Sequence, residues 1–105
     1  MTLRQKQSNF VRLIGLLIVY AYEQGYELTF GDTYPGKFAH SEFGQHPKGL
    51  AIDLNLFKDG IYLRSTESHK LLGAYWESLD SLCTWGGHWS DGNHYSFDEF
   101  KRRTP

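Results

Sequence analysis

Two short segments of the chain carry residues that could bind one metal ion together. His46 precedes Asp53 by seven residues, and Asp91 precedes His94 by three. A catalytic zinc takes three protein ligands from His, Asp or Glu and leaves a fourth position to water. His46, Asp53 and His94 supply such a set, and Asp91 then remains as a general base. The spacing also fits a surface histidine and two loop aspartates, and on its own it slightly favours that second interpretation.

The first of these segments predicts a strand with two different faces. Over residues 49–57 every second side chain is apolar, so Asp53 is expected on the face that points away from the core. A rigid strand holds a ligand better than a loop does. Gly49 lets the backbone pass closely, and Ala51 is small enough to leave room beside a metal ion.

The rest of the chain predicts a small α+β domain. Helical spacing of apolar residues alternates with short strand-like segments and glycine-containing turns. The expected elements are a helix over residues 3–24 ended by Gly25, a strand over 26–30, a long loop over 31–48, a turn at 58–60 and a return strand over 61–64, a second helix capped by Ser65 or Thr66 and ended by the loop 85–89, and a closing strand over 95–97. The predicted architecture is two main helices packed on a small antiparallel sheet, whose polar face carries the candidate ligands, in one catalytic domain over residues 1–105.

Composition and charge disfavour several classes of protein. Eleven Lys and Arg against 12 Asp and Glu give a formal charge of −1, which lacks the basic field of a nucleic-acid-binding protein. The single Cys83 excludes an internal disulfide, and we expect it as a buried thiol at a helix end. The apolar run over residues 13–21 is shorter than the roughly 20 residues that span a bilayer, and no small-residue cleavage site follows it. We therefore expect a leaderless monomer that is made in the cytoplasm and does not insert into the membrane.

Three motifs resemble those of the zinc peptidases that cut bacterial cell-wall peptides. They are His46-x-x-Gly49-x-Ala51-x-Asp53, Trp85-Gly-Gly-x-Trp89 and Asp91-x-x-His94. These peptidases comprise the D-alanyl-D-alanine carboxypeptidases and the L-alanyl-D-glutamate endopeptidases of phage endolysins, which share the fold of the hedgehog signalling domain. The resemblance extends along the chain through Tyr20-Ala21-x-x-x-Gly25 and Gly31-Asp32-x-Tyr34.

The resemblance implies a role for each candidate residue. It makes His46, Asp53 and His94 the ligands of a Zn²⁺ cofactor and Asp91 the catalytic base. Two positions depart from the family pattern. An Arg common after the first strand is replaced by Pro35-Gly36-Lys37, and a Ser two residues before the first His is replaced by Gly44.

Further residues are candidates for contact with the substrate. Lys37 is a possible substitute for the missing Arg, and His40 sits in a loop that could line the cleft. Tyr34, His88 and Trp89 are also candidates, although a tryptophan beside a Gly-Gly pair is as often part of the local core and a loop histidine is usually solvated. We expect His69 to be exposed on the second helix.

The function that the resemblance predicts is zinc-dependent hydrolysis of peptidoglycan stem peptides by a phage or prophage endolysin, which reaches the wall with the help of a holin. A carboxypeptidase needs an Arg for the terminal carboxylate of its substrate, and only Arg64 could approach the motifs. This favours an L-alanyl-D-glutamate endopeptidase over a D-alanyl-D-alanine carboxypeptidase. A non-catalytic, zinc-stabilised binding module of the same fold stays an alternative, against which Asp91 argues.

Overall fold

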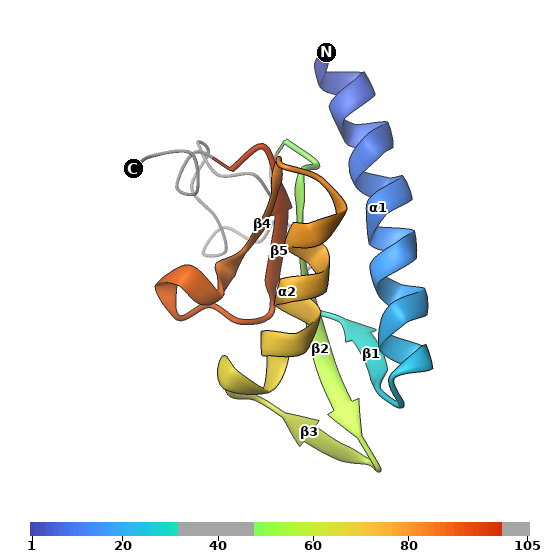
Figure 1. The fold of residues 1–105 in the computed structure, drawn as a ribbon, viewed down its shortest axis with the longest axis vertical. Helices are drawn as coiled ribbons and strands as arrows, with labels where there is room; N and C mark the ends of the chain where they lie inside the picture. Colours follow the sequence, from blue (N-terminus) through green and yellow to red (C-terminus); the bar gives the residue numbers. More distant parts are fainter. Residues whose placement is uncertain (32–47, 100–105) are drawn as a thin grey trace.

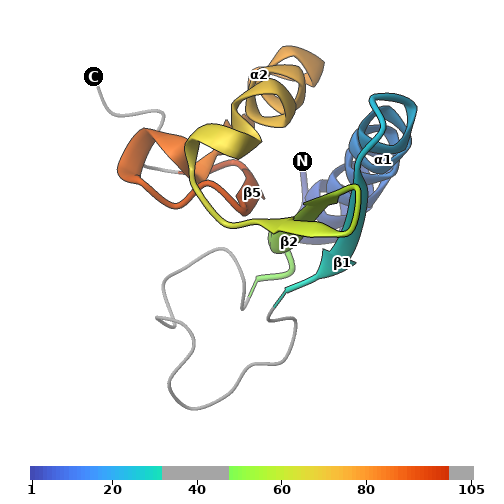
Figure 2. The same ribbon diagram turned by 90° about the horizontal axis from the view of Figure 1, so that it is seen from below.

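A computed structural model of the chain describes residues 1–31 and 48–99 (Figure 1). Figure 2 shows both α-helices on the same side of the antiparallel sheet, which confirms the predicted α+β class. The elements in chain order are α1 (Leu3–Glu23), β1 (Glu27–Phe30), β2 (Ala51–Lys58), β3 (Ile61–Leu63), the 3-10 helix η1 (Glu67–His69), α2 (Lys70–Leu79), β4 (Cys83–Trp85), the 3-10 helix η2 (Gly86–Trp89) and β5 (His94–Phe97).

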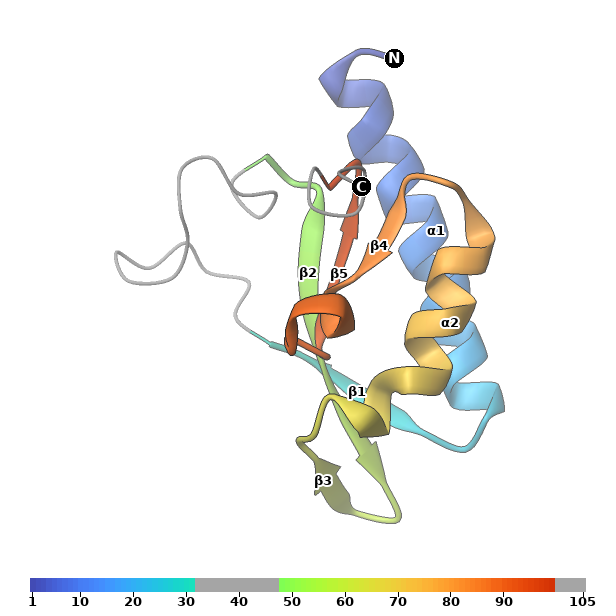
Figure 3. The same ribbon diagram turned by 60° about the vertical axis from the view of Figure 1, so that its left-hand side comes forward.

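The central strand of the sheet is β2, which has three neighbours. β1 pairs with residues 54–57 along one edge. Along the other edge, β5 pairs with residues 51–53 and β3 pairs with residues 56–58. Between these two ladders, the Leu54 N–H donates to the Asn93 carbonyl oxygen over 2.9 Å. At this point along β2, β3 has ended at Leu63 and β5 begins at His94, so the loop before β5 meets the edge of β2 between the two ladders (Figure 3).

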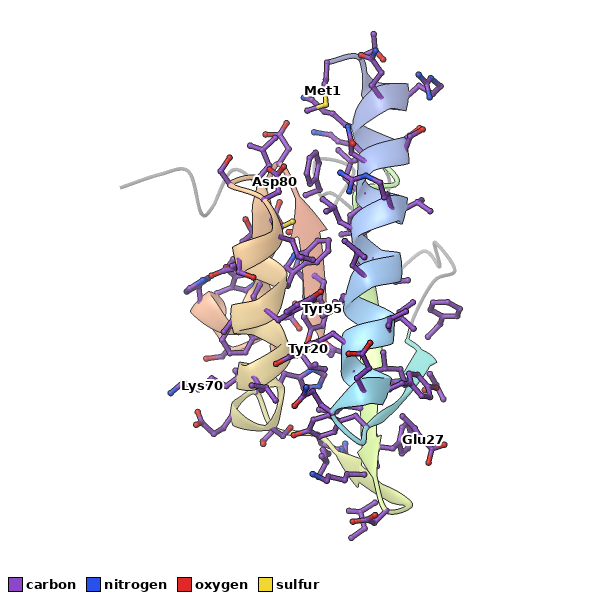
Figure 4. All side chains as sticks on the ribbon, turned by 45° about the vertical axis from the view of Figure 1, so that its right-hand side comes forward. Met1, Tyr20, Glu27, Lys70, Asp80 and Tyr95 are labelled. Carbon is purple, nitrogen blue, oxygen red and sulfur yellow. The ribbon has the colours of Figure 1, made fainter. Side chains whose placement is uncertain are left out.

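The hydrophobic core fills the space between the helices and the sheet. The Trp76 indole of α2 meets the Phe10 ring of α1 edge-on at 5.9 Å and donates to two carbonyl oxygens of the sheet, those of Thr84 and Ser96. Tyr20 stacks on Tyr75 with ring centroids 3.9 Å apart. Figure 4 labels Tyr20 of α1 and Tyr95 of β5 among the side chains of this core. The buried apolar side chains are Phe10, Leu13, Ile14, Leu17, Ala21, Leu50, Leu54, Leu56, Leu72, Trp76, Cys83, Tyr95 and Phe97.

Both ends of α1 follow local sequence signals. Thr2 and Gln5 form a reciprocal capping box at its start, and Gly25, at a φ of +88°, follows its end as expected. The predicted hairpin is also present, because Asp59 and Gly60 both take the positive φ that a tight turn between β2 and β3 needs. Among the described residues, no helix is both long and apolar enough to cross a membrane.

The second half of the chain departs from the prediction in three places. The second helix ends at Leu79 instead of continuing to Trp85, because residues 83–85 form β4 and pair with β5. Cys83 is buried as expected, but in this strand and not at a helix end. His69 lies in η1 and is only 2% exposed. It is buried because its Nδ1 meets the Tyr95 hydroxyl at 2.8 Å inside the core. The prediction that it is exposed was wrong.

Candidate metal and catalytic site

Asp53 and His94 are direct partners in the antiparallel ladder between β2 and β5. Asp53 Oδ1 lies 3.7 Å from His94 Nδ1, and the two side chains are 19% and 9% exposed. The alternation of β2 explains this position, because Leu54 points into the core and Asp53 points to the opposite face. Two of the predicted ligands therefore lie side by side on the polar face of the sheet.

Asp91 lies in the turn that leads into β5. Its N–H donates to the Gly86 carbonyl oxygen over 2.9 Å, and its own carbonyl oxygen accepts from the His94 N–H over 3.1 Å. The Asp91 Oδ2 atom is 4.0 Å from His94 Nδ1, and the side chain is 49% exposed. The turn thus places a solvent-accessible carboxylate beside the Asp53–His94 pair.

Two glycines of the Gly-Gly loop make this close approach possible. A Cβ atom at Gly86 would lie 2.2 Å from the Asp91 carbonyl oxygen and 2.7 Å from the His94 Cβ atom. A Cβ atom at Gly87 would meet the Trp85 ring at 2.3 Å. The Trp85 indole N–H in turn donates to the Gly92 carbonyl oxygen over 2.7 Å, which ties the loop to the Asp91 turn.

Glu99 completes the surroundings of His94 and was not predicted from the sequence. Its Oε1 lies 3.1 Å from His94 Nε2, and its side chain is 14% exposed. The chain turns back after β5 because Asp98 has a φ of +61° and donates its N–H to the Leu82 carbonyl oxygen. Nothing in the spacing of Glu99 from His94 indicates this turn, so no sequence signal could have identified it.

The carboxylates around His94 control its charge. Burial lowers the pKa of His94, but hydrogen bonds to Asp53 and Glu99, with the charges of Glu99 and Asp91, outweigh burial and raise it to about 9. In the absence of a metal, His94 is therefore protonated at neutral pH and partly offsets the negative charge of its neighbours.

The chemistry of the donors fits a zinc ion. Two atoms bound to a tetrahedral zinc at about 2.0–2.1 Å lie about 3.3 Å apart. The 3.7 Å between Asp53 Oδ1 and His94 Nδ1 is close to that separation. In the part of the chain that the structure describes, no three His, Cys, Asp or Glu side chains gather as a metal site. The predicted third ligand, His46, lies outside the described residues.

The predicted substrate contacts have different surroundings. The Trp89 ring lies 5.6 Å from the His94 ring and is half-buried, so it forms a wall next to the site. His88 is exposed, and its Nε2 lies 2.7 Å from Glu77 Oε2. The same oxygen accepts a hydrogen bond from the backbone N–H of Trp85. Tyr34, Lys37 and His40 lie outside the described residues.

A polar hollow with a volume of about 230 Å³ adjoins Asp91. It lies where the edge of β2 changes partner from β5 to β3. Its walls combine the end of the hairpin, the start of η1 and the Asp91 turn. The described residues that line it are Asn55, Tyr62, Leu63, Arg64, Thr66, His69, Ser90, Asp91, Gly92 and Asn93.

A comparison with known proteins identifies the family of the chain. The family model described as D-alanyl-D-alanine carboxypeptidase matches residues 39–97, which include β2, β5 and the Asp91 turn. No curated protein matches the chain. The family match covers more than half of the 105 residues. The chain therefore belongs to the D-alanyl-D-alanine carboxypeptidase family of peptidases.

Proposed function

We propose that the protein is a zinc-dependent peptidase that hydrolyses the stem peptides of bacterial peptidoglycan. The observation that carries this proposal is the meeting of three residues on one face: Asp53 and His94 are 3.7 Å apart, and the Asp91 carboxylate lies 4.0 Å from the same imidazole nitrogen. Membership of a peptidase family supports the same chemistry.

The zinc ligands that we propose are Asp53 through Oδ1, His94 through Nδ1, and His46. When bound, zinc polarises the scissile carbonyl and lowers the pKa of a water molecule to about 7. Glu99 holds Nε2 of His94, so Nδ1 is the nitrogen left to face Asp53 and the metal.

Asp91 is the general base in this proposal. Its carboxylate takes a proton from the water that attacks the carbonyl carbon, and then gives that proton to the amine nitrogen as the C–N bond breaks. The products are a carboxylate and a free amine. The half-exposed position of Asp91 suits this role, because a proton carrier must reach both water and substrate.

We propose the L-alanyl-D-glutamate bond as the one that is cut, by a phage or prophage endolysin that reaches the wall with a holin. Such an endopeptidase must accept a chain on both sides of the scissile bond. Exposed Arg64 and half-exposed Asp91 both line the polar hollow, so a peptide on the leaving-group side of the bond can reach it from solvent.

A second candidate is a D-alanyl-D-alanine carboxypeptidase. Arg64 lines the same hollow as Asp91 and could meet a terminal carboxylate there. The absence of the family's Arg after the first strand therefore does not exclude a carboxypeptidase, and the description of the matching family names this activity.

Digestion of purified peptidoglycan, followed by mass spectrometry, tests the proposal and separates the two candidates. Stem peptides that begin with D-glutamate support the endopeptidase, and release of single D-alanine residues supports the carboxypeptidase. A chelator should abolish either activity, and added zinc should restore it. Full activity in the chelator, or no cleavage with zinc loaded, would contradict the proposal.

A further inference from the structure

We infer that the polar hollow beside Asp91 binds the free α-carboxylate of the substrate residue whose amine is the leaving group, with Arg64 as the residue that binds it. This inference rests on the proposed function, since it assumes that Asp91 delivers a proton to that amine. It adds a subsite that none of the metal or base assignments contains.

The position of the hollow follows from the topology of the sheet. Residues 51–53 of β2 pair with β5 and residues 56–58 pair with β3, so the side chain of Asn55 lies between the two ladders. Two other parts of the lining are joined by a hydrogen bond, in which the Gly92 N–H donates to Thr66 Oγ1 over 3.2 Å. Asp91 and Arg64 both line the hollow, Asp91 from the turn before β5 and Arg64 from the segment between β3 and η1.

Among the described groups that line the hollow, one cation is available to bind an anionic ligand. Arg64 and Asp91 are the charged groups among the described lining residues. His69 also lines it, but burial lowers the pKa of His69 to about 4, so this imidazole is neutral at pH 7. Within residues 1–31 and 48–99, Arg64 has no carboxylate partner and lies over the Tyr62 ring, 5.7 Å from its centroid. Stacking on a ring leaves the guanidinium N–H groups able to bind an anion.

The wall beneath Arg64 is held by side-chain hydrogen bonds. The Tyr62 hydroxyl donates to Asn55 Oδ1 over 3.3 Å, and Asn55 Nδ2 donates to Thr29 Oγ1 over 3.3 Å. The Tyr62 ring also stacks on Phe57, with centroids 5.0 Å apart. The ring on which Arg64 rests is thus fixed to two other strands of the sheet.

The chemistry of the substrate places an anion close to the nitrogen that Asp91 protonates. In the terminal D-alanyl-D-alanine bond, and in the L-alanyl-D-glutamate bond when the glutamate continues through its side chain, the scissile nitrogen is attached to a carbon that carries a free α-carboxylate. That carboxylate must lie within a few ångströms of the group that protonates the nitrogen. A guanidinium fork matches a carboxylate through two parallel hydrogen bonds, so one subsite serves both candidate substrates.

Two synthetic stem peptides test the inference: one with the α-carboxylate of the leaving residue free, and one with the same group as an amide. For Arg64→Gln we expect KM for the free peptide to rise about 10-fold or more, as expected for losing a charged hydrogen bond. The kinetics of the amide peptide should not change. Arg64→Lys should recover part of the loss. Arg4→Gln is the matched control, because Arg4 is an exposed arginine of α1 whose guanidinium donates to Ser8 Oγ over 2.9 Å and does not line the hollow.

A binding measurement separates this inference from the proposed function. Calorimetry with the zinc-free protein should show that wild type prefers the free peptide to the amide, and that Arg64→Gln loses this preference while its unfolding temperature is unchanged. If wild type shows the preference but cleaves neither peptide when loaded with zinc, the proposed function fails and the subsite stands. If Arg64→Gln keeps wild-type KM and the wild-type preference, the subsite assignment is wrong, whatever the activity.

Discussion

The Nε2 atom of His94 lies 3.1 Å from Oε1 of Glu99, on the opposite side of the ring from Asp53. In the neutral imidazole this contact favours a proton on Nε2, which leaves the lone pair of Nδ1 directed toward the proposed metal. Both side chains are largely buried, so the orientation of the ring is set before any metal binds.

The first prediction is a pH dependence of zinc binding. The pKa of His94 is raised to about 9, so zinc must displace a proton from this residue at neutral pH. We expect the apparent affinity to rise with pH by up to about 10-fold per unit from pH 7 and to level off near pH 9. Competition against a chelator with known pH behaviour measures this. An affinity independent of pH over that range would contradict the assignment of His94.

The second prediction concerns Glu99→Gln. Glutamine keeps a hydrogen-bonding oxygen but removes the charge, which should lower the pKa of His94. The rise of zinc affinity with pH should therefore end at a lower pH than in wild type. Above pH 9, where protons no longer compete, zinc affinity should fall about 10-fold to 100-fold. Glu67→Gln is the matched control, because Glu67 is 83% exposed and only lies near Lys70. Equal curves for wild type and Glu99→Gln would show that Glu99 does not position His94.

The third prediction separates the base from the ligands. Asp91→Asn keeps the shape of the turn but cannot accept a proton, so we expect bound zinc to stay and turnover to fall about 100-fold or more. His46→Ala and Asp53→Ala should instead lower the zinc content and the unfolding temperature together. Glu67→Gln serves as the control, since Glu67 is 83% exposed and lies 3.9 Å from Lys70. Metal analysis and thermal unfolding decide the result, and near-wild-type turnover in Asp91→Asn would remove it from the mechanism.

The fourth prediction uses the buried His69. Its pKa is lowered to about 4 in the folded protein, against 6.5 for the free group, so the folded state resists protonation. The part of the unfolding free energy that depends on neutral His69 is fully present above pH 6.5. It is lost as the pH falls toward 4, and the loss is about 3 kcal/mol at most. His69→Gln can still bond to Tyr95 but does not titrate in this range. Urea unfolding from pH 7 to pH 4 should therefore show a smaller loss of unfolding free energy in the variant than in wild type. An equal loss in both proteins would contradict the prediction.

The fifth prediction compares two glycines. Gly86→Ala places a Cβ against the backbone of Asp91, which cannot move without shifting the turn, and should cost about 1–3 kcal/mol of unfolding free energy. Zinc affinity should fall with it. Gly15→Ala has nothing within 4 Å and lies within α1, so it should stabilise by about 0.5–1 kcal/mol. Loss of stability in both variants, or in neither, would mean that the close contact at Gly86 is not the cause.

The sequence predicted the elements that depend on local signals. The alternation around Asp53 identified the strand and its polar face, and Asp59-Gly60 marked the hairpin, because a period of two and a positive φ are properties of a few neighbouring residues. The end of the first helix at Gly25 was predictable for the same reason.

Sequence patterns did not predict the features that depend on contacts between residues far apart in the chain. β4 is a strand because it pairs with β5, although Cys83 and its neighbours continue the apolar pattern of the preceding helix. His69 is buried because its imidazole contacts the Tyr95 hydroxyl in the core. Glu99 reaches His94 through the left-handed turn at Asp98, which no apolar period marks.

Strand β3, which carries Tyr62 and leads to Arg64, pairs with residues 56–58 of β2, whereas Asp53 and His94 pair at the other end of β2. In our proposal, the arginine that binds the substrate carboxylate and the residues that cleave the bond thus come from different segments of the chain. Exchange of residues 61–64 could redirect the protein to peptides with a different group at the cut, with the cleaving apparatus left in place. In evolution, the same separation would let substrate preference drift between related proteins by changes in one short hairpin.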